Sequence, residues 1–333
     1  MKKSLKQILS LVLLLALALV FAGCKKQAEV RIGILQPVEH DALGLAKKGF
    51  IDALAEEGYV EGKNLVIDYQ NANGQESDLV TLAKSLTNKC DMTLGIGTGA
   101  SVQLQSAQVN SGSTKPIIFT AVTDAVTAGL VTSNAAPGGY ITGSSDANPV
   151  EAQIDLIKEC LPEADKMGIL YTQSETNSEV QANQAQAQAE KQGLTVVRMT
   201  CTDTTDLAQV AERLCATEGL DAIYIPTDNL IAANMATVKA AVEKYHVLCV
   251  TGEESIMTKG GHVTLSIDYY ELGKKAGKMA AAILKGEASP STTPVQTMSI
   301  TECKYLMCSD NLASAGITIP DEVKAKCTDV KAQ

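Results

Sequence analysis

The sequence predicts an α/β fold in which two doubly wound parallel-sheet lobes are joined by a hinge of three chain crossings. Two observations predict it. From residue 30 onward, short apolar runs alternate with amphipathic helical stretches, and continuous apolar runs between helices are typical of parallel strands covered on both faces. Stretches rich in Gly, Pro, Ser and Asn interrupt this alternation and leave strand-and-helix sets of similar size on either side.

The predicted strands are the apolar runs themselves. In chain order they span residues 30–35, 65–70, 92–97, 116–122 and 140–145 in the first half, then 166–171, 194–199, 221–226, 247–252 and 262–267 in the second.

Helices are expected between these strands because the intervening stretches carry residues that start and stop helices. Thr204, Thr205 or Asp206 can cap the helix that follows the strand at 194–199. The Ala- and Gln-rich stretch 178–193 is typical of a surface helix made of good helix formers, with Ser178 as its expected cap.

Three stretches are predicted to carry the chain between the lobes: 136–149, 260–273 and 285–296. Two lobes joined in this way form a cleft that can close by hinge motion. We assign residues 30–146 plus about 266–292 to the first lobe, and residues 147–265 plus about 293–333 to the second.

The first residues have the layout of an export signal, because lysines precede an uncharged apolar run from residue 8 to residue 22. The run ends in Phe21-Ala22-Gly23-Cys24, which resembles a bacterial lipobox. In lipoproteins of that kind the cysteine is acylated and the chain is cut before it. The alternative is an uncleaved anchor helix, and both place the rest of the chain outside the cytoplasmic membrane. We therefore expect a signal peptide at 1–23, lipidation at Cys24, a polar tether at 24–29 and a membrane-anchored, extracytoplasmic protein.

Composition narrows the class of protein further. Hydrophobic residues make up 45% of the chain, which is enough for real cores, and the formal net charge is −10. Nucleic acid is not expected as a partner, because binding to a phosphate backbone depends on Lys and Arg. The other eight cysteines mostly sit in apolar patterns typical of buried thiols, with at most a local bridge such as Cys303 to Cys308. They are Cys90, Cys160, Cys201, Cys215, Cys249, Cys303, Cys308 and Cys327.

A ligand site is expected where the carboxyl ends of the parallel strands meet, since loops and helix starts converge there. The loops at these positions are short and rich in hydroxyls and amides, which suits a cleft that grips a small polar molecule. They span residues 36–41, 71–75, 97–101, 120–126, 172–178, 226–229, 252–255 and 266–270.

The glycines at 95, 97 and 99 do not match a dinucleotide-binding fingerprint, because they follow the third strand and position 100 is Ala. Two interpretations remain. The turn can aim the free N–H groups of a helix starting near Ser101 at an anion, with the hydroxyls of Thr98 and Ser101 helping. Alternatively, the glycines only let a strand and a helix pack closely.

Three carboxylates follow predicted strands: Asp124, Asp228 and Asp268. Together with an anion site they suit a zwitterion, whose carboxylate would lie at the helix start and whose ammonium would lie on an aspartate. Each aspartate can equally cap the helix that it precedes. Their shared position at the cleft favours the first hypothesis.

Catalytic, metal and cofactor sites are not expected. His40, His246 and His262 show no metal-ligand spacing, and only His40 falls in a predicted cleft loop. The chain has no GxSxG nucleophile elbow and no Trp that could form a sugar platform.

Several segments together carry a resemblance to a known family: "ILQPVEHDAL", "GIGTGASVQLQSA", "PIIFTAVTDAVTAGLV", "GILYTQSETNS", "DAIYIPTDN" and "SIDYYELGKKAGKMAAAIL". They resemble the solute-binding lipoproteins of ABC importers in the tryptophan/tyrosine-type family, from about residue 30 to about residue 320. The resemblance implies the type I periplasmic-binding fold. It also implies ligand contacts at Glu39, His40, Thr98, Gly99, Ala100, Ser101, Thr123, Asp124, Asn177, Ser178, Asp228, Asn229 and Asp268.

The function implied is capture without chemical change: a small ligand, expected to be an aromatic amino acid, binds between the lobes and is delivered to the permease subunits. Polar anchors would hold the amino-acid backbone and an apolar wall its side chain. Tyr171 and Tyr224 could supply that wall or belong to the core. The rival hypotheses are a sensory binding lipoprotein and an extracytoplasmic enzyme on the same fold.

Overall fold

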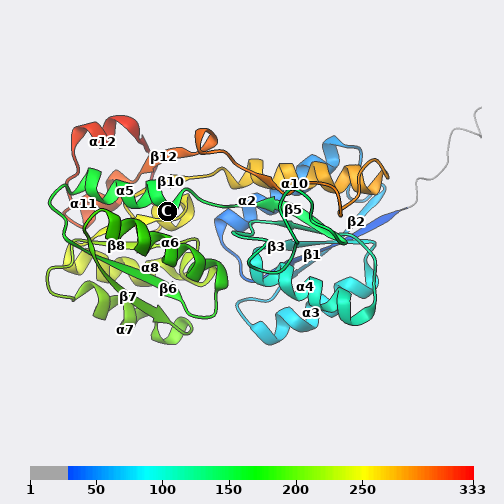
Figure 1. Ribbon diagram of the computed structural model, residues 1–333, viewed down its shortest axis with the longest axis horizontal. Helices are drawn as coiled ribbons and strands as arrows, with labels where there is room; N and C mark the ends of the chain where they lie inside the picture. The colour runs from blue at the N-terminus through cyan, green and yellow to red at the C-terminus, as the bar shows by residue number, and fades with distance from the viewer. Residues whose placement is uncertain (1–28) are drawn as a thin grey trace, which may run out of the picture.

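The computed structural model describes residues 29–333 as two lobes, each a central sheet covered by helices on both faces (Figure 1). The predicted signal peptide 1–23, the lipidation site Cys24 and all but the last residue of the tether 24–29 lie outside the described residues.

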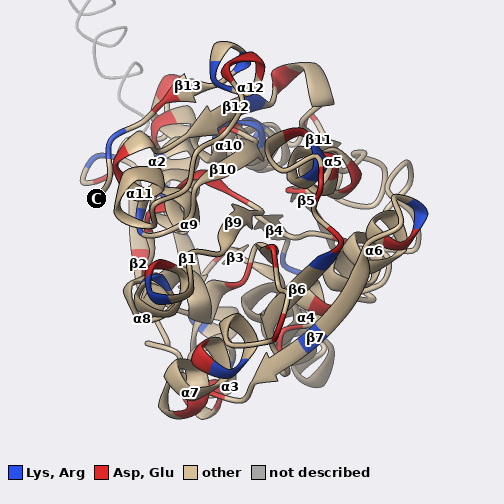
Figure 2. Cartoon of the chain, turned by 90° about the vertical axis from the view of Figure 1, so that its left-hand side faces the viewer, with Lys and Arg blue, Asp and Glu red and all other residues tan. Residues whose placement is uncertain are grey.

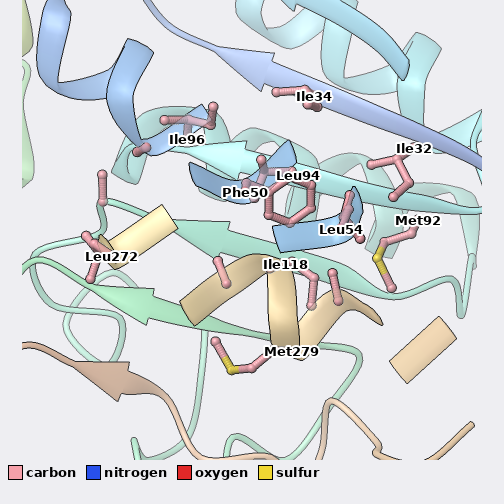
Figure 3. Close-up of a cluster of buried hydrophobic side chains, with 14 of the residues drawn as sticks. Ile32, Ile34, Phe50, Leu54, Met92, Leu94, Ile96, Ile118, Leu272 and Met279 are labelled. Atoms are coloured by element: carbon pink, nitrogen blue, oxygen red, sulfur yellow. The ribbon is translucent and has the colours of Figure 1, made fainter. Parts of the chain in front are cut away.

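The sheet of the first lobe has the strand order β11-β5-β4-β3-β1-β2, and all its pairings are parallel. Helices α2 and α10 cover one face, where they bury the cluster shown in Figure 3, and α3 and α4 cover the other. The elements are β1 (Val30–Gln36), α2 (Asp41–Glu56), β2 (Leu65–Asn71), α3 (Glu76–Lys89), β3 (Met92–Ile96), α4 (Thr98–Ser111), β4 (Ile117–Thr120), β5 (Ile141–Ser145), α10 (Tyr269–Leu284) and β11 (Gln296–Thr297).

The sheet of the second lobe has the order β13-β12-β10-β9-β8-β6-β7, in which only the pairing of β12 with β10 is antiparallel. Helices α5 and α6 cover one face, and α7 and α8 cover the other. The elements are α5 (Val150–Cys160), β6 (Lys166–Thr172), α6 (Thr176–Lys191), β7 (Thr195–Cys201), α7 (Thr204–Cys215), β8 (Ala222–Ile225), α8 (Asn229–Tyr245), β9 (Leu248–Thr251), α9 (Glu254–Thr258), β10 (Val263–Ser266), η1 (Ile300–Glu302), β12 (Lys304–Met307), α11 (Ser309–Ser314), α12 (Asp321–Lys326) and β13 (Thr328–Asp329).

The predicted fold class and every predicted strand are confirmed, while one crossing falls elsewhere than expected. The chain leaves the first lobe after β5 and returns after β10, where α10 packs on α2 in the lobe that Figure 1 colours blue and cyan. It then stays with the first sheet through β11, where Gln296 pairs with Ser144. The third crossing therefore comes after Thr297, later than the predicted boundary near 292.

Helix α2 contacts α10 closely because both carry glycines at the interface. A Cβ added at Gly49 would lie 2.0 Å from the carbonyl oxygen of Tyr270, and one at Gly273 would lie 2.0 Å from that of Ala46. Ion pairs flank this contact, with Lys274 bound to Glu56 at 2.8 Å.

Charged residues of both signs are mixed on the surface. In Figure 2, Lys and Arg residues are interspersed with Asp and Glu over the visible side and do not form one basic face.

Several helix starts differ from the predicted ones because the caps differ. Helix α7 is capped by Asp203, whose side chain accepts from the N–H of Thr205, and not by Thr204, Thr205 or Asp206. Ser178 lies inside α6, which begins at Thr176.

All eight cysteines among the described residues are free thiols, and all but Cys303 and Cys327 are buried. Burial raises the pKa of several of them, that of Cys160 to about 12. The predicted buried thiols are thus confirmed, and the allowed bridge between Cys303 and Cys308 is not present.

Candidate ligand-binding site

A small cavity lies between the lobes at the carboxyl ends of the strands, and we call it the inter-lobe cavity. Its volume is about 10 Å³, room for about one water molecule. Any larger ligand therefore requires the lobes to move apart or the lining side chains to shift. The lining residues are His40, Leu43, Ala121, Thr123, Asp146, Asn177, Thr227, Asp228, Asn229, Glu253 and Tyr269.

Direct contacts between the lobes surround this cavity. His40 Nε2 lies 3.1 Å from Asn229 Oδ1, and Gln181 Nε2 donates to Thr123 Oγ1 at 3.3 Å. Outside the cavity, Lys259 of the second lobe forms an ion pair with Asp41 of the first at 2.8 Å. The two lobes are thus closed onto each other, with polar contacts joining their facing loops.

Carboxylates dominate the chemistry of the cavity. Asp146, Asp228 and Glu253 line it, and Glu175 lies directly behind, where it accepts from the side chains of Asn177 and Asn229. No described residue that lines the cavity is a Lys or an Arg. Burial raises the pKa of all four carboxyl groups. A cation that entered the cavity would stabilise the charged forms of these carboxyl groups and lower their pKa values.

The carboxylate of Asp228 accepts hydrogen bonds from several neighbouring segments of the second lobe. It is the N-cap of α8, where it accepts from the N–H of Ile231 at 3.0 Å. It also accepts from the N–H of Thr172 at 2.7 Å and from the hydroxyl of the same residue at 2.8 Å, and Ser178 adds a further side-chain hydrogen bond. These donors occupy most of the lone pairs that a carboxylate offers.

The carboxylate of Asp146 accepts fewer hydrogen bonds than that of Asp228. It follows β5 at the first crossing between the lobes and is buried. Its carboxylate accepts from the hydroxyl of Tyr269 at 2.9 Å and from that of Thr123 at 3.2 Å. With its own backbone N–H as a third donor, the carboxylate still has a lone pair free for another donor. Tyr269 lies where the chain crosses back to the first lobe.

Glu253 and Glu175 hold the starts of α9 and α8. Glu253 is the N-cap of α9 and accepts from the N–H groups of Ser255 and Ile256 at 2.5 and 3.0 Å. Burial raises its pKa to about 7. Glu175 accepts from the N–H groups of Asn229 and Leu230 at 3.0 and 2.9 Å. Burial and the neighbouring charge of Asp228 raise its pKa to about 7.

His40 contributes an unused acceptor. Burial lowers its pKa to about 4, so the ring is neutral at pH 7. A neutral ring that donates from Nε2 to Asn229 Oδ1 carries a lone pair on Nδ1, and this buried Nδ1 has no hydrogen-bond partner among the described residues.

The glycine-rich turn shows the close packing of the second interpretation, while anion binding at this helix start stays a prediction. A Cβ at Gly95 would lie 2.5 Å from Ser101 Oγ, so this glycine permits close packing. Gly97 has φ 85° and is the N-cap of α4, which begins at Thr98 and not near Ser101. The Ser101 hydroxyl donates to the carbonyl of Gly97 at 2.8 Å and does not face the cavity. Thr98 Oγ1, in contrast, is buried without a hydrogen-bond partner among the described residues.

The structure brings only some of the predicted residues together. His40, Thr123, Asn177, Asp228 and Asn229 line the inter-lobe cavity. Ser178 supports Asp228 from behind, Ala100 is part of a core, and Gly99 lines a separate groove.

Glu39, Asp124 and Asp268 do not line the cavity. Glu39 accepts from the hydroxyl of Tyr69 at 2.6 Å near the surface. Asp268 caps α10 and pairs with Lys304 at 3.3 Å. Asp124 accepts from the N–H of Thr127 at 2.9 Å. Burial alone would raise the pKa of Asp124, but the hydrogen bonds from Thr127 and Val126 lower it.

The two tyrosines considered for the apolar wall are core residues. Tyr171 accepts from Arg198 at 2.6 Å, and Tyr224 is fully buried and donates to Gln153 at 2.7 Å. Sequence reasoning missed other cavity residues. Glu253 lay in a loop that was expected at the cleft, and Asp146 directly follows a predicted strand, so the strand-end rule would have found both. The missed residues are Leu43, Ala121, Asp146, Thr227, Glu253 and Tyr269.

The comparison with protein families decides the identity of the chain. Residues 31–331 match the family model described as ABC transporter substrate binding protein. The chain belongs to this family. It is therefore an extracytoplasmic substrate-binding component of an ABC transporter, and the family is one of binding proteins and not of enzymes.

Individual relatives agree with this assignment. A tyrosine-binding protein from Clostridioides difficile (strain R20291) is 38% identical over 281 residues, which cover 84% of this chain and 78% of the relative. An ABC domain from Streptococcus pneumonia, solved in complex with L-Trp, is 36% identical with a TM-score of 0.84 and covers 91% of this chain and 100% of that one.

A third relative matches less closely in shape. This is the ligand-free, open structure of a substrate-binding protein with adhesive properties from Clostridium difficile, which is 33% identical. Its TM-score is 0.67, over 91% of this chain and 100% of the other. Since its identity is nearly that of the L-Trp complex, the lower score agrees with lobes that touch in the present structure. Within residues 29–333, no helix has both the length and the apolar character needed to span a bilayer.

Proposed function

We propose that this substrate-binding protein captures an aromatic amino acid in the inter-lobe cavity and delivers it to the permease of an ABC importer. One observation carries the proposal: buried carboxylates line the cavity and no described Lys or Arg does. The ammonium group of an amino acid supplies the missing cation. The relatives that bind tyrosine and contain L-Trp support an aromatic side chain.

Asp146 is the best-placed anchor for the ammonium group, in place of Asp124, Asp228 and Asp268, the three candidates that the sequence offered. Asp228 is occupied by donors from Thr172, Ile231 and Ser178, whereas Asp146 accepts from the hydroxyls of Tyr269 and Thr123 and from its own backbone N–H, which is one donor fewer. The free lone pair of His40 Nδ1 is a second acceptor for the same ammonium. Asp228 then positions the loop between β8 and α8 and contributes negative charge to the cavity.

The ligand carboxylate requires donors, and the start of α4 supplies them. Gly97 has no side chain to cap this helix, so its first N–H groups are free to bind an anion, and the dipole of the helix favours negative charge there. Thr98 Oγ1 adds a buried hydroxyl without a partner among the described residues.

Calorimetric titration tests this function with Trp, Tyr, Phe and Leu as ligands. Asp146→Asn should weaken binding of every amino acid that binds by about thirty-fold to several thousand-fold, because it removes a charge-assisted hydrogen bond to a buried cation. Asp124→Asn and Asp268→Asn are the matched controls, since both side chains cap turns or helices outside the cavity. Aromatic ligands should bind more tightly than Leu, because a ring buries more surface.

Two outcomes would contradict this proposal in different ways. If none of the four amino acids binds the wild type, the proposed ligand class is wrong. If they bind and Asp146→Asn matches the wild type while Asp228→Asn does not, the ammonium lies on Asp228 and only the anchor assignment fails.

We also propose that the protein is held at the membrane through lipidation of Cys24, on the strength of the Phe21-Ala22-Gly23-Cys24 segment. A sensory role with a receptor as partner uses the same site, and gene neighbours that encode a receptor, not a permease and an ATPase, would favour it.

A further inference from the structure

A second, larger space between the lobes continues from the inter-lobe cavity, and we call it the mouth groove. Its volume is about 440 Å³, and it shares Asn177 and Asn229 with the cavity. Binding sites for small molecules commonly have volumes of 300–1,000 Å³. The inter-lobe cavity of about 10 Å³ holds polar anchors but has no room for a ring, so a ring attached to an anchored amino acid needs an adjoining space of this size.

Apolar residues from both lobes line part of the mouth groove, among mostly polar neighbours. Leu79 and Gly99 line it from the first lobe, and Leu230 and Ala233 line it from α8 in the second. Ala233 is exposed and Gly99 has no side chain, so both walls leave space between them. The acidic side chains that line this groove, Glu76, Glu175 and Asp203, include Glu175, whose carboxylate is already bound by N–H groups.

The other space that adjoins the inter-lobe cavity is less suited to a ring. It lies on the hinge side, shares Glu253 and Tyr269 with the cavity and has a volume of about 290 Å³. Asp41, Glu254, Asp268 and Lys304 line it, and a ring placed there would desolvate the ion pair between Lys304 and Asp268, which are 3.3 Å apart.

Asn234 gives the mouth groove a specific polar contact. It lies on α8 at a point where the helix is kinked, with φ −127° and ψ 21°. Its Nδ2 donates to the carbonyl oxygen of Leu230 at 2.8 Å. This fixes the amide and leaves Oδ1 as an acceptor on a residue that lines the groove.

We propose that the mouth groove is the side-chain subsite, in which the aromatic ring of the ligand packs between Leu79 and Ala233 and donates its phenol O–H or indole N–H to Asn234 Oδ1. This inference rests on the proposed function and makes it more specific: the site prefers Tyr and Trp to Phe. Phe fills the same space but leaves the acceptor of Asn234 without a donor.

The test uses two pairs of substitutions on α8. In each pair, one residue lines the mouth groove and the other does not. Ala233→Leu fills the groove, and Ala236→Leu adds the same side chain at an exposed position of α8 that does not line it. We expect Ala233→Leu to weaken Trp, Tyr and Phe by about tenfold or more, because a side chain then occupies the space of the ring. Ala236→Leu should match the wild type for every ligand.

The polar contact is tested with Asn234→Ala against Thr237→Ala, a half-buried neighbour outside the groove. We expect Asn234→Ala to weaken Tyr and Trp by about two- to tenfold, the effect of losing one neutral hydrogen bond, and to leave Phe unchanged. Calorimetric titration with all three ligands measures both effects, and thermal unfolding checks that the variants fold.

The outcomes separate this inference from the function on which it rests. If the wild type binds aromatic amino acids and Ala233→Leu binds them equally well, the ring lies elsewhere and the inference is overturned while the function stands. If Asn234→Ala weakens Phe as much as Tyr, the hydrogen bond to Oδ1 is overturned. If the wild type binds no amino acid at all, both fail together.

Discussion

Glu253 shows what a buried carboxylate beside the cleft does to the stability of the protein. It is 2% exposed, and burial raises its pKa from 4.5 to about 7. Between these values the folded state holds a proton that the unfolded state has lost. The free energy of unfolding should therefore fall as pH rises from about 4.5 to about 7, by about 3 kcal/mol at full effect.

Urea unfolding at pH 5 and pH 8 checks this prediction. Glu253→Gln should reduce the loss of stability between the two pH values, because a glutamine does not titrate and its oxygen can still accept from Ser255 and Ile256. Glu271→Gln, at an exposed position in the first turn of α10, is the control. An unchanged loss in Glu253→Gln would mean that other groups cause it.

At this scale the sequence could predict which loops reach the cleft but not which side chain in each loop faces it. Asp124, Asp228 and Asp268 all follow strands and all accept from N–H groups of their own turns, yet of the three only Asp228 lines the inter-lobe cavity. Whether a carboxylate caps a helix or faces a ligand depends on backbone angles within one or two residues, and those angles are set by tertiary packing. Asp146 was missed because it stands in the predicted crossing 136–149, which was not counted among the loops at the cleft.

Secondary structure was the most predictable part of the molecule. Strands β1 to β10 were predicted from their apolar runs, and most of them are largely buried, as in the fully buried β3, while β2 and β7 are mostly half-buried. Strands β11 and β13 have two residues each and are exposed, so no hydrophobic pattern in the sequence predicts them. They exist because neighbouring strands offer free edges, which is a property of the assembled sheet.

The contact between α2 and α10 gives a prediction at the level of elements. Gly49→Ala should destabilise the protein by about 1–3 kcal/mol or more, because its Cβ would lie 2.0 Å from the carbonyl oxygen of Tyr270 and force the helices apart. Gly44→Ala in the same helix is the control. Its Cβ would meet nothing nearer than Glu39 Oε1 at 3.4 Å, so higher helix propensity should stabilise it by up to about 1 kcal/mol.

Chemical denaturation of the two variants measures both changes. Equal effects of the two substitutions would contradict the account, because they would show that helix propensity and not the distance between α2 and α10 decides the outcome.

The division into lobes was predictable, because composition changes where the chain crosses between them. The exact exit from the first lobe was not, since it depends on the pairing of β11 with β5, two residues against a distant strand. The closed arrangement of the lobes could not be predicted either. It depends on contacts such as that between Gln181 and Thr123, which no local pattern reports.

Membrane attachment is a property of the whole chain and is tested at that scale. Cys24→Ser should move the protein from the membrane fraction to the soluble fraction, or leave an uncut precursor, because the acylated side chain is lost. Cys303→Ser, a half-buried thiol far along the chain, should stay with membranes. Fractionation with intact mass measurement reports both, and a membrane-bound Cys24→Ser protein of mature size would contradict lipidation.

The ion pair between Asp41 and Lys259 and the contact between His40 and Asn229 join the lobes without help from any ligand. Contacts of this kind set how often the ligand-free protein visits its closed form. If that form is about one tenth of the population, the apparent dissociation constant is about tenfold weaker than the intrinsic one. Affinity in this protein is thus set in two places. The cavity determines which ligand binds, and the ion pair between Asp41 and Lys259, which lies outside the cavity, adjusts the working concentration range without changing that choice.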